Sequence, residues 1–162
     1  MDARKLGTVV VIVVAAIVVY FLNYRGAGAR EYNDKIVNLQ LETAKKIGAL
    51  FSGFDVNRME RQHEEATTAI QNALSTLRAM EPYDGDSEFR DAAIAAFEFY
   101  DSVCQSEYFQ MRDLVADGDA TDEKIDTLKA IAADIQERES AIDARVHAAQ
   151  AAFAKKHGFE VR

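Results

Sequence analysis

The stretch TDEKIDTLKAIAADIQERESAIDARVHAAQAAFAKKHG, residues 121–158, decides the fold of this chain. Thr121 is a favourable N-cap residue, and the carboxylates of Asp122 and Glu123 suit the positive end of a helix dipole. Gly158, directly after His157, is a typical helix stop. Between these signals, apolar residues recur every three or four positions, which predicts one amphipathic helix of about ten turns. Its apolar face comprises Ile125, Leu128, Ala132, Ile135, Ile142, Val146, Ala149 and Phe153.

Three earlier segments show the same helical periodicity. The first runs from Arg30 to a stop at Gly53, and Asp55 can cap the second, which ends before Pro82. The third follows the turn-prone sequence 84–87 and closes at Gly118. Four amphipathic helices with short connections favour antiparallel neighbours. We therefore expect an all-α fold in which residues 30–162 form an up-down-up-down antiparallel four-helix bundle.

A hydrophobic segment precedes the predicted bundle. Residues 6–22 are apolar except for Gly7, Thr8 and Tyr20, and a helix of this length nearly spans a hydrocarbon core of about 30 Å. We expect residues 1–29 to hold an N-terminal transmembrane helix and a Gly/Ala-rich joint. The alternative is a cleaved signal peptide, because Arg4 and Lys5 resemble a charged n-region and residues 27–29 a cleavage site.

Either reading places the bundle outside the cytoplasm. A short N-terminal tail favours a single-pass protein with its N-terminus inside and the bundle outside the cytoplasm. The formal net charge of −8 falls almost wholly on the bundle. An acidic surface repels phosphate groups, so no nucleic-acid partner is expected.

Polar residues on the apolar faces are the candidate site residues. At 100° per residue, His63 falls on the stripe of the second helix, and Glu107 falls on the stripe of the third. Antiparallel pairing brings both to one level, together with Cys104, the single cysteine. Because a buried carboxylate needs a partner, we predict a hydrogen bond or ion pair between Glu107 and His63.

Two interpretations of this polar layer remain open. A satisfied polar contact that fixes helix register is the first. The second is a zinc site built from His63, Glu107 and Cys104, which are admissible ligand types. Glu60 and His63 also form a Glu-x-x-His pair, but a di-iron bundle needs a second such pair, which the sequence lacks. We therefore assign no metal, cofactor or catalytic residue.

Four further residues sit at ambiguous positions. Glu139 and Gln150 fall on the stripe of the last helix, and we expect solvated edge positions for both. Phe99 and Phe109 lie off the main stripe of the third helix, where they cover a core edge or form an exposed patch.

Three short motifs carry a resemblance. EYNDKIV at 31–37, Phe99-Tyr100, and QAAFAKK at 150–156 together resemble an uncharacterised family of bacterial surface proteins known from Leptospira and other bacteria. Many members look like lipoproteins, whereas this chain has no cysteine near its start. The resemblance therefore implies a single-pass protein of a bacterial cell envelope, with the bundle in the periplasm or outside the cell. In this protein the apolar segment replaces the lipid, and the resemblance brings no known activity.

The function expected from these features is non-enzymatic. The sequence contains no phosphate-binding glycine loop, nucleophile elbow or Cys/His catalytic spacing. We expect an interaction or scaffold module that binds a protein partner or forms a homo-oligomer. The alternative is a ligand- or metal-binding bundle used for periplasmic binding or sensing, which needs an interior cavity or three converging ligands near His63.

Overall fold

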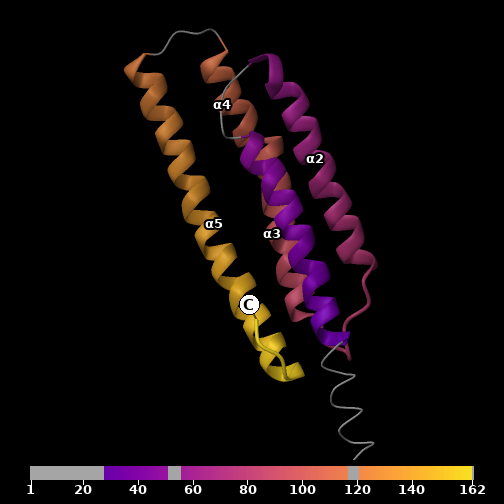
Figure 1. Ribbon diagram of the computed structural model, residues 1–162. Coiled ribbons are helices and arrows are strands. Elements are labelled where there is room, and N and C mark those ends of the chain that lie inside the picture. Colours follow the sequence, from indigo (N-terminus) through magenta and orange to yellow (C-terminus); the bar gives the residue numbers. More distant parts are fainter. Residues whose placement is uncertain (1–27, 51–55, 117–120, 162) are drawn as a thin grey trace, which may run out of the picture.

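The computed structural model describes residues 28–50, 56–116 and 121–161. These residues are almost entirely helical (Figure 1): a first helix over 28–50 is followed by α2 (Val56–Ala79), α3 (Glu88–Gln105), α4 (Glu107–Val115) and α5 (Asp122–His157). The predicted all-α fold is confirmed. The expected membrane segment at 6–22 lies outside the described residues. None of the described helices combines the length and apolarity needed to cross a membrane.

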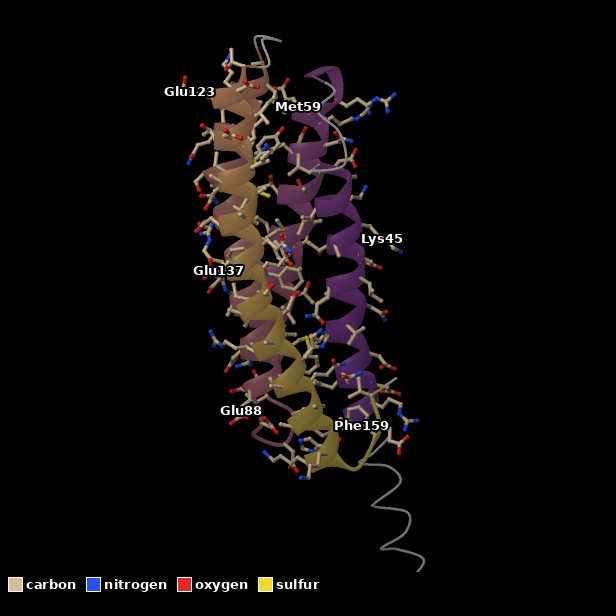
Figure 2. The ribbon with its side chains drawn as sticks, turned by 90° about the vertical axis from the view of Figure 1, so that its left-hand side faces the viewer. Lys45, Met59, Glu88, Glu123, Glu137 and Phe159 are labelled. Atoms are coloured by element: carbon tan, nitrogen blue, oxygen red, sulfur yellow. The ribbon has the colours of Figure 1, made fainter. Side chains whose placement is uncertain are left out.

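The helices lie lengthwise beside one another as a bundle, and α4 continues α3 toward one end (Figure 1). Met59 and Glu123 lie near that end, which we call the distal end; Glu88 and Phe159 lie near the other, which we call the base (Figure 2). Hence α2 descends from the distal end to the base, α3 and α4 return, and α5 descends again.

The core runs through the bundle as a continuous apolar cluster. Helical spacing of three and four residues turns one face of each helix inward, and each fully buried large side chain contributes about 1.5–3 kcal/mol. The largest fully buried side chains are Tyr108, Phe89, Ile36, Leu50, Ile70, Leu77, Val103 and Cys104. Two of them, Tyr108 and Cys104, belong to the candidate site described below.

A two-residue turn at the base joins α2 to α3. Asp84 and Gly85 both have positive φ angles, 52° and 77°, as a type I′ turn requires. Tyr83 and Asp86 exchange backbone hydrogen bonds of 3.1 and 2.9 Å across it. The turn places the Asp86 carboxylate against α3, where Oδ1 accepts a 3.2 Å hydrogen bond from the Glu88 amide.

Both ends of α5 match the sequence prediction. Thr121 Oγ1 accepts a hydrogen bond from the Lys124 amide, and Gly158 adopts a left-handed conformation (φ 74°) while the Phe159 amide donates to Ala154 O over 3.0 Å. Only part of the predicted apolar face of α5 is buried. Buried residues lie only in the half nearer the base: Val146, Gln150, Phe153 and Ala154. Ile125, at the distal end, is 37% exposed.

The third predicted helix is broken, which the sequence pattern did not reveal. α3 ends at Gln105 and α4 begins at Glu107, because Ser106 leaves the helical region with φ −124° and ψ −73°. The Ser106 hydroxyl bonds the Glu107 carboxylate, a local contact that competes with helical hydrogen bonding. The break lies beside His63, and the two features are linked through a hydrogen bond.

Candidate functional site

His63 is held by a backbone hydrogen bond from α2 to the end of α3. Its Nε2 lies 2.9 Å from the carbonyl oxygen of Cys104. Cys104 is in the last turn of α3, where carbonyl groups lack partners within the helix. His63 therefore gives this carbonyl group a donor from another helix. Since a carbonyl only accepts, Nε2 carries the hydrogen in this contact.

Two aromatic rings of α4 enclose the His63 ring. It stacks on Tyr108 with centroids 4.7 Å apart and an interplanar angle of 18°. Phe109 tilts against it at 4.9 Å and 54°, and the rings of Tyr108 and Phe109 meet edge-on at 5.4 Å. The Tyr108 hydroxyl donates to Met59 O over 3.1 Å. The cluster thus joins α2 to α4 by ring contacts and a hydrogen bond.

The predicted contact between His63 and Glu107 is wrong. Glu107 turns instead toward α5, where it forms an ion pair with Arg138, and it also accepts a hydrogen bond from Ser106. Burial acts to raise the pKa of Glu107, but the hydrogen bonds from Ser106 and Arg138 outweigh it and hold the pKa below its usual value. The sequence placed Glu107 at the correct height along the bundle but predicted the wrong neighbour for its carboxylate, because the break at Ser106 changes the helix register.

Cys104 contacts His63 through its backbone carbonyl. Its side chain is buried, and burial, with a smaller effect from the charge of Asp101, raises the pKa of the thiol to about 11. A thiol with this pKa is almost fully protonated at neutral pH and is a poor nucleophile and metal ligand. Across the described ranges, no three His, Cys, Asp or Glu side chains gather as a metal site.

A groove opens beside this cluster, between α2 and α4 near the distal end. Its volume is about 600 Å³, within the range of small-molecule sites. We call it the α2–α4 groove, and it is lined by Met59, Glu60, His63, Tyr108, Phe109, Arg112, Asp113 and Ala116. Sequence reasoning had singled out Glu60 and His63, which lie one helical turn apart on α2. It had also named Phe109 of α4 as a core-edge or exposed residue, but it missed Arg112 and Asp113.

The charged groups of the α2–α4 groove are unevenly paired. The Arg112 guanidinium lies 4.7 Å above the Phe109 ring and donates to Asp113 Oδ1 from Nε (2.9 Å) and Nη2 (2.6 Å). Glu60 is exposed and has no ion-pair or hydrogen-bond partner among the residues that the structure describes. The groove therefore carries two carboxylates against one guanidinium, and that guanidinium is already neutralised.

A second polar cluster lies at the base. The Asp86 carboxylate, 7% exposed, is 2.8 Å from Lys156 Nζ and 3.3 Å from His157 Nε2. His157 also packs edge-on against Tyr83 and tilts against Phe153. These contacts fasten the end of α5 to the turn before α3. The Asp86 carboxylate therefore has a structural role, which is to bind the end of α5.

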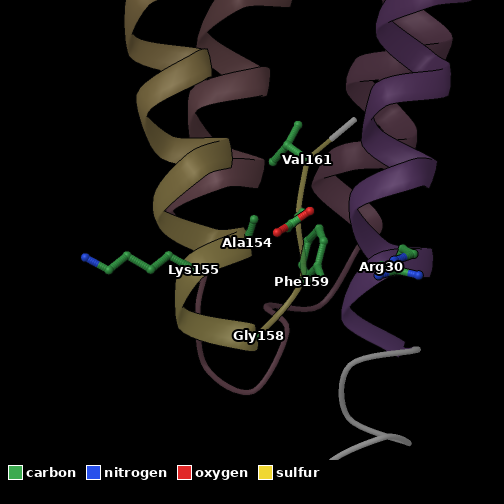
Figure 3. A pocket seen from close by; sticks show the side chains of 7 residues that line it. Arg30, Ala154, Lys155, Gly158, Phe159 and Val161 are labelled. Carbon is green, nitrogen blue, oxygen red and sulfur yellow. The ribbon is translucent and has the colours of Figure 1, made fainter.

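The base also has a shallow pocket beside the final residues. After Gly158 the chain turns back between α5 and the first helix, and Phe159 points toward the helix that carries Arg30, while Lys155 points away (Figure 3). The pocket holds about 420 Å³ and is wide open to solvent. Its two cations, Arg30 and Lys155, do not converge, so it lacks the charge pairing of an anion site.

Comparison with known proteins adds no assignment to this geometry. No protein-family model, curated protein or solved structure matches the chain. The α2–α4 groove is therefore judged on its own chemistry.

Proposed function

We propose that the protein is a membrane-anchored, non-enzymatic interaction module of a bacterial cell envelope. Residues 6–22 would form the single membrane pass with the N-terminus inside, and the up-down-up-down bundle would lie in the periplasm or outside the cell. The resemblance to bacterial surface proteins supports this placement. The apolar length of the segment supports an anchor over a cleaved signal peptide.

One observation carries the non-enzymatic part of the proposal: His63 and Glu107, the predicted polar pair, are engaged in structural contacts with different partners. His63 Nε2 bonds the Cys104 carbonyl, and Glu107 pairs with Arg138. The thiol of Cys104 is buried and protonated. General acid–base or nucleophilic catalysis needs such groups within reach of one reacting atom. Here His63 and Glu107 each make a contact between helices instead, and the two contacts share no partner.

The placement of the α2–α4 groove supports an interaction role. The anchor would enter the bundle at the base, where the first helix starts, whereas Met59 lies near the distal end (Figure 2). Residues 28–50 alone span about 35 Å along a helix axis. The groove would therefore be held well clear of the lipid surface and would face soluble or surface-bound partners.

A photo-crosslinking experiment tests the proposal. The full chain, purified from membranes in mild detergent, would carry a photoreactive amino acid at Glu60 on the groove or at Glu64, which is exposed on the same helix but does not line the groove. We expect an intact mass that includes residues 1–29 and capture of a partner from position 60 only. Capture from both positions alike, or a mass lacking these residues, would contradict the proposal.

The same groove favours a second candidate function, which is the binding of a small ligand. Its volume of about 600 Å³ and its aromatic lining are typical of ligand pockets, although it opens to solvent and is not an interior cavity. The crosslinked species separates the two candidates. A product of discrete protein mass indicates a macromolecular partner, and a small mass increment indicates a ligand.

A further inference from the structure

The α2–α4 groove has an aromatic wall, in which the His63 and Phe109 rings are inclined to each other by 54°. His63 and Phe109 are half-buried, so part of each ring faces the groove, and Tyr108 fixes their positions from below as a fully buried residue. Met59 contributes a polarizable thioether to the same wall. Such a surface favours a ligand with a flat ring, which stacks in offset or edge-on geometry.

Hydrogen-bond acceptors remain available in the groove, beside the N–H groups of Arg112 that do not contact Asp113. The Tyr108 hydroxyl and His63 Nε2 already donate to backbone carbonyls, and Arg112 donates twice to Asp113. In contrast, the Glu60 carboxylate and the Oδ2 atom of Asp113 accept no hydrogen bond within the described part of the chain. A ligand that satisfies them has to bring hydrogen-bond donors.

The charges of the groove favour the same ligand class. With Arg112 neutralised by Asp113, the Glu60 carboxylate gives the groove a net negative charge, and the whole chain carries −8. Such a field concentrates cations and repels anions. A divalent metal ion finds no set of three ligands within the described ranges. An organic cation needs fewer direct ligands, because aromatic faces also attract it.

We propose that the α2–α4 groove binds an aromatic ammonium ion, with the ring against His63 and Phe109 and the ammonium group at Glu60. This inference rests on the proposed binding role of the groove and adds the chemical class of its ligand. Glu60 and His63 lie three residues apart on one face of α2, so ring and ammonium of a short arylalkylamine reach both.

Calorimetric titration of the full chain in phosphatidylcholine nanodiscs tests the inference, with empty nanodiscs as the blank. Three probes of similar size differ in charge: phenethylamine, 2-phenylethanol and phenylacetate. We expect saturable, one-to-one binding of phenethylamine, at least fivefold weaker binding of the alcohol, and no binding of the anion, because one charge pair contributes about a fivefold or greater preference.

Two matched variants locate the site. Glu60→Gln keeps the size of an exposed side chain and removes its charge, so the dissociation constant of phenethylamine should rise about fivefold or more. Glu64→Gln removes an exposed carboxylate one turn away that does not line the groove, and it should leave binding unchanged. Equal effects of the two variants, or equal binding of the amine and the alcohol, would overturn the inference.

The outcomes also separate this inference from the proposed function. If position 60 captures a partner while phenethylamine does not bind, the ligand class is wrong and the interaction role stands. If the anion or the alcohol binds best, the groove is a ligand site of another class, and the inference again fails. Absence of both crosslinking and probe binding would remove the proposed function as well.

Discussion

Gln150 Nε2 donates a 2.9 Å hydrogen bond to Asn33 Oδ1 and so joins α5 to the first helix across 117 positions of sequence. Both side chains are buried, Asn33 being 6% and Gln150 9% exposed. The solvated position expected for Gln150 from the sequence is therefore wrong. A buried amide that has a partner contributes little net stability, but one without a partner costs the full desolvation penalty.

Replacing Gln150→Leu should accordingly destabilise the bundle by about 1–3 kcal/mol, because Asn33 Oδ1 loses its donor in a buried site. Urea unfolding of the full chain, followed by circular dichroism, measures this change. The double variant Asn33→Leu/Gln150→Leu should recover part of the loss. If it loses the sum of both single effects, the two amides act independently and the bond is unimportant.

His63 should contribute more to the free energy of unfolding than His147, which lies on an exposed face of α5. His63→Ala removes the donor to the Cys104 carbonyl and the stacking on Tyr108, for a combined cost of about 2–3 kcal/mol. His147→Ala, at an exposed position of α5, is the matched control and should change the free energy of unfolding by less than about 0.5 kcal/mol. Similar losses in both variants would mean that the helix break does not depend on His63.

The Cys104 thiol should be almost inert in the folded protein. Its pKa is raised from 9.0 to about 11, so the thiolate fraction at pH 7.5 falls about a hundredfold, and burial slows reagent access further. Labelling with Ellman's reagent should be slow for the native chain and rapid, with one thiol per chain, in urea. Rapid labelling of the native chain at pH 7.5 would show that the α3–α4 break opens readily.

Acidification should weaken the base of the bundle through Asp86. Burial acts to raise the pKa of this carboxyl, but hydrogen bonds from Lys156, the Glu88 amide and His157 together hold it below its usual value. A depressed pKa in the folded state stabilises above the unfolded pKa of about 4, and this contribution is lost as pH falls through the folded value. The loss of folding stability at low pH should therefore depend on Asp86.

Asp86→Asn tests this linkage. At pH 7 the variant should be less stable by about 1–3 kcal/mol, and the difference from the original chain should shrink below pH 4. Thermal unfolding between pH 7 and pH 2.5 gives both values. Glu81→Gln, exposed in the same connection, is the control and should run parallel to the original chain. A difference that stays constant with pH would exclude an ionised Asp86 as its source.

Sequence alone gave the features that depend on local chemistry. Thr121 and Gly158 delimit α5 because caps and left-handed glycines act within a few residues. The α2–α3 turn was found for the same reason, since Asp84 and Gly85 suit positive φ angles. The helical periodicity was sufficient to predict the all-α fold.

The features that sequence reasoning missed depend on contacts between helices. The break at Ser106 is stabilised by His63 from another helix, and an apolar stripe continues through it without interruption. Aligning the antiparallel helices by residue number placed Glu107 beside His63, but the break turns the Glu107 carboxylate toward Arg138. Ile125 fits the stripe of α5 and is nonetheless exposed, since the buried residues of α5 all lie in its half nearer the base.

The short length of α4 has a consequence for how the protein moves. Nine residues are too few for a stable isolated helix in water, so α4 depends on the rings of Tyr108 and His63 that fasten it to α2. Proteins open locally where such fastening is sparse. Amide hydrogens of α4 should consequently exchange with solvent sooner than those of α3, and each opening would dismantle one wall of the groove. An occupant of the groove would slow that exchange, so protection of α4 reports occupancy without any assumption about the occupant.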